Sequence, residues 1–160
     1  MQTRRTYDIR SFINCSTKAI VYLASCECGK QYVGCRLCPY GWLLHGDQCY
    51  YFSDVRRRTW NQSRDQCKMM GSDLLVIKDK EQQEFIERTL SQRTDDEYWI
   101  GLHPDGDGWR WVDGEQYNSS LFQIQTQPSG RCVSVTKSYY YQSSCSSAFR
   151  WMCVRKAVRI

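Results

Sequence analysis

The chain has 160 residues, ten cysteines and a formal net charge of +5, and this length fits one domain with an appendage. Residues 1–37 hold six Lys or Arg against Asp8 and Glu27, a balance of +4 that leaves the remainder nearly neutral. Bulk charge therefore does not favour nucleic-acid binding by the main part of the chain. No run approaches the roughly 20 apolar residues that cross a bilayer, and the N-terminus leads into no signal-peptide core.

The cysteines and the glycosylation sequons favour an extracellular protein. Ten cysteines in a short chain indicate either disulfides in an oxidising compartment or metal binding in a reducing one. Three Asn-x-Ser sequons support the first alternative, and they begin at Asn14, Asn61 and Asn118. We expect a secreted or cell-surface location, although this chain shows no signal or membrane anchor.

Residues 1–37 are predicted to be a basic leader without an independent fold. They contain one short apolar run and four cysteines, at Cys15, Cys26, Cys28 and Cys35. A fold of fewer than about 40 residues usually needs disulfides, a metal or a partner. Thiolates from Cys26, Cys28 and Cys35 could form a zinc site with Cys38, but Cys38 is also a candidate for a bridge to Cys49, so no metal is expected. The pairing of the leader cysteines stays open.

A hairpin and two helices are predicted after the leader. The hairpin turns at Gly46-Asp47, which brings Cys38 and Cys49 within bridging reach. The first helix begins with the capping box Thr59-x-x-Gln62 and ends at Gly71. Its inward face is expected to consist of Trp60, Ser63, Cys67 and Met70.

A short buried strand, Leu74–Ile77, is expected next. The second helix follows, with another capping box at Asp79-x-x-Gln82. Its core side should consist of Phe85, Ile86 and Leu90.

The next stretch predicts a strand over Tyr98–Leu102, a turn at 105–108 and a second strand from Trp109. Aromatic and branched side chains favour a half-buried sheet surface, and large rings contribute much of the burial energy of a small core. We therefore expect Trp99, Trp109 and Trp111 to be core scaffold rather than a site.

The last third of the chain contains a long polar connection, residues 117–130, of the kind that often binds partners. Three strands are predicted after it, over 131–135, 138–141 and 149–154. The order strand, helix, helix and then many strands predicts an α+β domain.

In this order, the residues resemble a C-type lectin-like domain over 38–156, and more specifically the killer-cell lectin-like receptors. The motifs are Cys38-Pro39, Trp42, Cys49-Tyr50, Trp60 to Cys67, Trp99-Ile100-Gly101-Leu102, Trp109-x-Trp111-x-Asp113-Gly114, Cys132, Cys145 and Trp151-x-Cys153. The resemblance implies two helices, two antiparallel sheets, a long loop region and three structural disulfides. It pairs Cys38 with Cys49, Cys67 with Cys153, and Cys132 with Cys145, and leaves 157–160 as a tail.

The resemblance also bears on calcium. In calcium-dependent members, ligands come from a Glu-Pro-Asn or Gln-Pro-Asp motif and from a Trp-Asn-Asp motif. The corresponding positions here read Gln127-Pro128-Ser129 and Tyr140-Tyr141-Gln142, and no Asp or Glu follows Glu115. Because calcium takes roughly 6 to 8 oxygen ligands and depends on carboxylates, no calcium cofactor is expected. A glycine-rich turn explains Asp105 and Asp107 more simply.

The resemblance implies a cell-surface recognition receptor, or its ectodomain, from a family of membrane-anchored proteins. Tyrosine with small polar residues and arginine is typical of protein-recognition surfaces, and strand alternation should turn one of three tyrosines toward the core. We expect a protein ligand, acidic, sialylated or itself lectin-like, and a homodimer is possible. The alternative is a calcium-independent carbohydrate-binding lectin. The candidate contacts are Gln125, Gln127, Arg131, Lys137, Tyr139, Tyr140, Tyr141 and Gln142.

Catalysis is not expected. The only histidines, His45 and His103, fall in predicted turns, and the cysteines near them are assigned to bridges. A second resemblance lies in the leader, where Ala19–Leu23 and Tyr32-Val33-Gly34 are similar to the opening hairpin of GIY-YIG endonucleases. The catalytic arginine and the metal-binding glutamate of that family do not follow, so no nuclease activity is expected.

Overall fold

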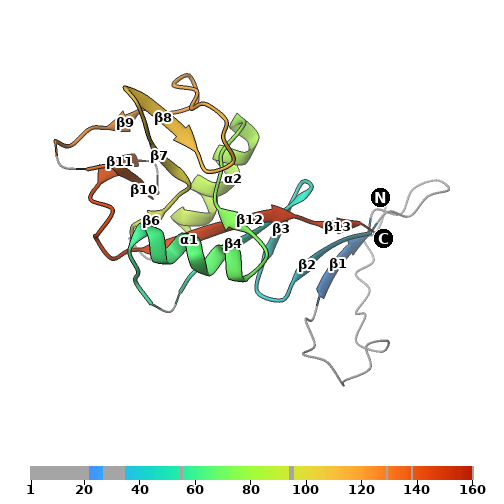
Figure 1. Ribbon diagram of the computed structural model, residues 1–160. Coiled ribbons are helices and arrows are strands. Elements are labelled where there is room, and N and C mark those ends of the chain that lie inside the picture. Colours follow the sequence, from blue (N-terminus) through green and yellow to red (C-terminus); the bar gives the residue numbers. More distant parts are fainter. Residues whose placement is uncertain are drawn as a thin grey trace. The chain divides into compact units, whose positions relative to one another are not determined.

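The computed structural model of the protein describes residues 22–26, 35–54, 56–93, 96–128, 130–137 and 139–159 (Figure 1). The chain forms two compact units, Met1–Tyr51 with Arg155–Ile160, and Phe52–Val154. The described residues contain no helix long and apolar enough to cross a membrane.

The first unit is built from short antiparallel strands. Cys38 and Cys49 form the predicted disulfide, with an S–S distance of 2.01 Å. Asp47, at the turn of the predicted hairpin, pairs with Arg36 at 2.7 Å and with Arg159 at 2.6 Å. The strands of this unit are β1 (Tyr22–Cys26), β2 (Cys35–Pro39), β3 (Leu43–His45), β4 (Gln48–Phe52) and β13 (Val158–Arg159).

The predicted leader lies only partly within the described residues. β1 pairs with β2, which places Cys26 opposite Cys35 in the register, and β2 crosses the boundary expected between residues 37 and 38. Asn14, Cys15, Cys28 and the Tyr32-Val33-Gly34 motif lie outside the described residues. The division into leader, domain and tail therefore stays a prediction.

The first helix, α1 (Trp60–Met69), confirms its predicted start. The Thr59 hydroxyl accepts a hydrogen bond from Gln62 N at 3.3 Å, and the Gln62 side-chain oxygen accepts one from Thr59 N at 3.2 Å. Trp60, Ser63 and Cys67 of the predicted inward face are buried, whereas Met70 is the C-cap residue after the helix and is only half-buried. The helix ends before Gly71, whose φ of 66° is the left-handed conformation typical of a helix C-terminus.

The second helix, α2 (Lys80–Ser91), confirms its predicted start only in part. The Asp79 carboxylate accepts from Gln82 N at 2.8 Å. The Gln82 side chain, however, accepts from Lys78 N at 2.9 Å and donates to Val76 O at 2.6 Å, instead of closing a second capping box.

The segment before α2 differs from the predicted strand. Only β5 (Asp73–Leu74) joins a ladder, whereas residues 75–77 are buried without being a strand. Gln82 provides the physical reason, because its buried amide binds Val76 O in place of a neighbouring strand.

The central sheet of the second unit has the strand order β12-β6-β10-β11-β9, with β5 also beside β12. β10 is antiparallel to β6 and β11, whereas β6–β12 and β9–β11 are parallel. The α+β class is confirmed, but the sheets are not purely antiparallel. The strands are β6 (Tyr98–Trp99), β9 (Ile124–Gln125), β10 (Cys132–Thr136), β11 (Tyr139–Ser143) and β12 (Arg150–Lys156).

The predicted strand Tyr98–Leu102 is interrupted. Its first part is β6, and its last residue begins β7 (Leu102–Asp105), which pairs with β8 (Gly108–Trp111) in a separate ribbon. Gly101 lies at the break, where its N–H donates to Leu75 O and its carbonyl accepts from Val112 N, each at 2.8 Å. Such a close approach of three backbones leaves no room for a side chain.

The core confirms two of the three expected tryptophans. Trp99 and Trp111 are buried, whereas Trp109 is only half-buried. Trp109 lies opposite Pro104, near the turn of the ribbon. The disulfides Cys67–Cys153 and Cys132–Cys145 form as the resemblance implied.

Replacing Gly101 by alanine should destabilise the protein. The added Cβ would lie 2.7 Å from Val112 Cγ2 and 3.0 Å from the Leu74 and Leu75 carbonyl oxygens, and overpacking of this kind costs about 1–3 kcal/mol. Denaturant unfolding measures the effect. Gly108→Ala is the control, because its Cβ would meet only Asp105 O at 3.9 Å. Equal midpoints for the two variants would contradict this packing.

Candidate recognition site

The long polar connection is held against the central sheet. Its strand β9 pairs with β11, so that Ile124 lies opposite Tyr140 and Gln125 opposite Tyr141. The Phe122 ring stacks on Tyr140 with centroids 3.7 Å apart and an interplanar angle of 14°. The Tyr117 hydroxyl donates to Phe122 O. Aromatic packing therefore fixes one half of this loop.

Tyr140 belongs to the core and not to the recognition site. It is 2% exposed, and its hydroxyl donates to the Glu87 carboxylate at 3.4 Å. Burial, together with the negative charge of Glu87, raises the pKa of Tyr140 far above its usual range. Strand alternation required one inward tyrosine, and the structure identifies it, which removes Tyr140 from the candidate contacts.

Tyr139 and Tyr141 project from the opposite face of β11. Tyr139 is 57% exposed, Tyr141 is half-buried, and their ring centroids are 6.2 Å apart. Gln125, opposite Tyr141 in the register, is exposed beside them. We call Gln125, Tyr139 and Tyr141 the tyrosine strip. The structure thus brings three of the eight predicted contacts together.

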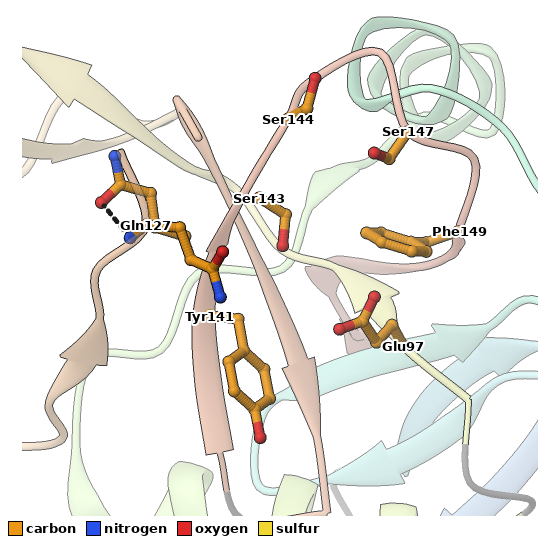
Figure 2. A pocket seen from close by; sticks show the side chains of 8 residues that line it. Glu97, Gln127, Tyr141, Ser143, Ser144, Ser147 and Phe149 are labelled. Carbon is orange, nitrogen blue, oxygen red and sulfur yellow. Dashed lines mark hydrogen bonds between the residues drawn. The ribbon is translucent and has the colours of Figure 1, made fainter. Parts of the chain in front are cut away.

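Gln142 fixes the second half of the loop. Its side-chain oxygen accepts from Gln127 N at 3.3 Å, the dashed line in Figure 2, and its side-chain nitrogen donates to Gly130 O. Gly130 lies so close that an added Cβ would be 2.7 Å from the Gln142 backbone. Gln142 was predicted to contact a ligand, and its amide is instead engaged within the protein, so it is a positioning residue.

The two predicted basic contacts do not form one patch. Arg131 and Lys137 are both exposed, but they flank opposite ends of β10. A strand of five residues is roughly 17 Å long at about 3.4 Å per residue. A single compact ligand group therefore cannot contact both side chains together with the tyrosine strip.

In the part of the chain that the structure describes, no three or more His, Cys, Asp or Glu side chains group as metal ligands would. Asp105 accepts from Arg110 Nε at 2.5 Å within its turn. Cys38, the fourth thiolate of the hypothetical zinc site, is bonded to Cys49. The expectations about calcium and zinc remain predictions.

The structure also places the predicted glycosylation sites and the two histidines. Asn61 on α1 and Asn118 in the long loop are exposed, and the Asn118 side-chain oxygen accepts from Ser120 N at 3.0 Å. His45 lies in β3 and His103 in β7, so both are in strands rather than in the predicted turns. The His103 ring packs edge-on against Trp60, with centroids 5.9 Å apart.

Sequence reasoning missed a pocket of about 400 Å³ beside β11. Its lining comes from three separate segments of the second unit, and Figure 2 shows these side chains surrounding one space. An acidic residue directly before a buried strand, Glu97 before Tyr98, was the only available sequence signal. The lining residues are Glu97, Gln127, Tyr141, Gln142, Ser143, Ser144, Ser147 and Phe149.

Removing the Gln142 amide should loosen the loop without unfolding the protein. In Gln142→Ala, Gln127 N and Gly130 O lose their partner, so the Gln127 amide should exchange with solvent at least tenfold faster. The amide of Val133 in the buried strand β10 should be unchanged. Hydrogen exchange measures both, and Gln125→Ala, which removes an exposed glutamine, is the matched control. Unchanged exchange at Gln127 would contradict the positioning role.

Comparison with known proteins agrees with this architecture. Residues 56–155 match the Lectin C-type domain family. Human C-type lectin domain family 7 member A is 36% identical over 126 residues, which cover 74% of this chain and 51% of that protein. The rat killer cell lectin-like receptor subfamily B member 1B allele C is 34% identical over 126 residues, covering 76% and 55%. The chain spans about half the length of these curated relatives.

Two solved structures share the fold. The C-type lectin domain of murine dendritic cell inhibitory receptor 2, in complex with N-glycan, aligns with a TM-score of 0.68 and 30% identity over 74% of this chain and 98% of that chain. The trimeric structure of Kupffer cell C-type lectin receptor Clec4f aligns with a TM-score of 0.62 and 26% identity, over 72% and 82%. Fold, disulfide pairs and family match agree: this chain belongs to the C-type lectin domain family.

Proposed function

We propose that this chain is the recognition domain of a cell-surface receptor that binds a protein ligand without calcium, through the tyrosine strip. The observation that carries the proposal is the Gln142 amide, which binds both Gln127 N and Gly130 O. Hydrogen bonds hold the loop at the positions where calcium-dependent relatives carry carboxylate ligands. A loop held in this way needs no ion to present its surface.

The composition of the strip favours a protein ligand. Tyrosine rings bury large area at low entropic cost, and small polar side chains beside them adapt to varied partners. Tyr139 is 57% exposed although it is a large aromatic residue. The rigid support comes from the other face of the same strand, where Tyr140 stacks on Phe122. A rigid, amphipathic and partly exposed strip of this kind suits a protein surface.

The names of the relatives also support a receptor role. One of the relatives described above, the rat killer cell lectin-like receptor subfamily B member 1B allele C, carries a receptor name. From these relatives we infer an extracellular, non-enzymatic domain of a membrane-anchored protein. Acidic or sialylated surfaces fit the exposed Arg131 and Lys137, one at each end of β10.

A calcium-independent carbohydrate-binding function is the second candidate. One structural relative was solved in complex with N-glycan. The pocket beside β11 contains serine hydroxyls and glutamine amides, which can bind sugar hydroxyl groups. Against this candidate, the Gln142 amide is already engaged within the protein.

A binding screen tests the proposal. The refolded chain is applied to arrays of cell-surface proteins and of glycans, in calcium and in excess chelator. We expect capture by a protein with equal strength in both buffers. Capture by glycans alone would favour the second candidate, and binding lost in chelator would contradict the proposed function.

Two alanine variants locate the site in the same assay. Tyr139→Ala and Tyr141→Ala should each weaken capture at least tenfold, because exposed tyrosines dominate interfaces of this composition. Tyr40→Ala is the matched control, since Tyr40 is 74% exposed in the other unit. Full binding by both strip variants would place the contact elsewhere.

A further inference from the structure

The Glu97 carboxylate belongs to the lining of the pocket beside β11. Glu97 is half-buried, and in Figure 2 its carboxylate points into the space bounded by Tyr141, Ser143 and Phe149. No hydrogen bond or ion pair joins this carboxylate to any residue that the structure describes. Burial raises the pKa of Glu97 above its usual value. A half-buried charge without compensation is costly, and a bound cation relieves that cost.

Two arginines near this segment are paired with another acid. Arg57 contacts the Asp96 carboxylate at 2.6 Å, and Arg150 contacts it at 3.1 Å. Asp96 directly precedes Glu97 in the chain. The two adjacent acids therefore differ in their partners. Asp96 forms ion pairs within the protein, whereas Glu97 faces the pocket.

The walls of the pocket suit a guanidinium group. Tyr141 and Phe149 present aromatic rings, which attract a cation held over or beside them. Ser143, Ser144 and Ser147 contribute hydroxyl oxygens, which can accept hydrogen bonds, to the lining of the same pocket. A volume of about 400 Å³ holds one long side chain. Arginine combines planar stacking with bidentate binding to a carboxylate, which a sugar hydroxyl cannot offer.

We propose that the Glu97 pocket is the anchor for a cationic side chain, best an arginine, of the protein ligand. The proposal rests on the proposed protein-binding function and names the chemistry of one ligand group. Tyr141 belongs both to the tyrosine strip and to the pocket wall, so the two surfaces are continuous. The protein ligand accordingly carries a basic residue where it meets the Glu97 pocket, even if acidic groups surround that residue.

Nuclear magnetic resonance titration of the full isotope-labelled chain tests the proposal. The probe is Nα-acetyl-arginine amide, and its neutral isostere Nα-acetyl-citrulline amide is the matched control compound. We expect saturable shifts at the amides of Ser143, Ser144 and Phe149 with the arginine probe, and at least tenfold weaker binding of the citrulline probe. Equal affinity for the two probes, or no saturable shift, would overturn the proposal.

Two variants complete the test. Glu97→Gln keeps the shape and removes the charge, so it should bind the arginine probe at least tenfold more weakly. Glu84→Gln removes an exposed acid of α2 and should bind as the wild type. Should Glu97→Gln fail to fold, the comparison of the arginine and citrulline probes on the wild-type chain still tests the proposal. Preferential shifts with methyl α-mannoside would assign the pocket to a sugar and overturn the proposal.

This test is independent of the array screen. Capture of a protein ligand without any response to the arginine probe would reject the anchor and leave the proposed function standing. Arginine binding without capture of any protein would reject the proposed function and retain the pocket chemistry.

Discussion

The disulfide Cys67–Cys153 is the constraint on which the second unit depends. It joins α1 to β12 across 86 residues of sequence, and all of the candidate recognition surface lies inside the loop that it closes. A loop of this length contributes about 4–5 kcal/mol in the chain-entropy model. Its strand β12 also pairs with β5 and β6, so the bridge fixes the helix and the centre of the sheet together.

Two sets of contacts connect this centre to the candidate recognition surface. Trp99 in β6 is fully buried, and β10 pairs with β6 on one side and with β11 on the other. Tyr140 then turns inward onto Phe122, which forces its neighbours Tyr139 and Tyr141 outward. The second disulfide, Cys132–Cys145, connects β10 to the segment that forms the pocket wall. The candidate recognition surface therefore rests on a packed sheet rather than on a free loop.

Sequence patterns predicted what depends on neighbours in the chain. The capping box at Thr59, the helical face with Trp60 and Cys67, and the alternation of the tyrosines all follow local periodicity, and the structure confirms them. The disulfide pairs needed the family resemblance, because spacing alone leaves many pairings open. Local reasoning predicts periodicity well because periodicity is a property of one segment.

Most of the wrong or missing predictions involve contacts between separate segments of the fold. Gly101 interrupts a strand because Leu75 and Val112 approach it. Gln82 and Gln142 bind backbone groups of other segments, which composition cannot reveal. The Glu97 pocket joins residues 97, 127, 141–144, 147 and 149, and only the folded sheet brings them together. Each case depends on a contact that the tertiary fold creates.

The central claim is that hydrogen bonds from Gln142, and not a calcium ion, hold the recognition surface. Thermal unfolding of the full chain in 10 mM calcium and in excess chelator tests it directly. An extracellular calcium site with a Kd of roughly 10⁻⁴–10⁻³ M would add about 1.4–2.7 kcal/mol at that concentration, which corresponds to a rise of several degrees in Tm. Our account predicts equal Tm values within about 1 °C. A rise of several degrees in calcium would contradict it.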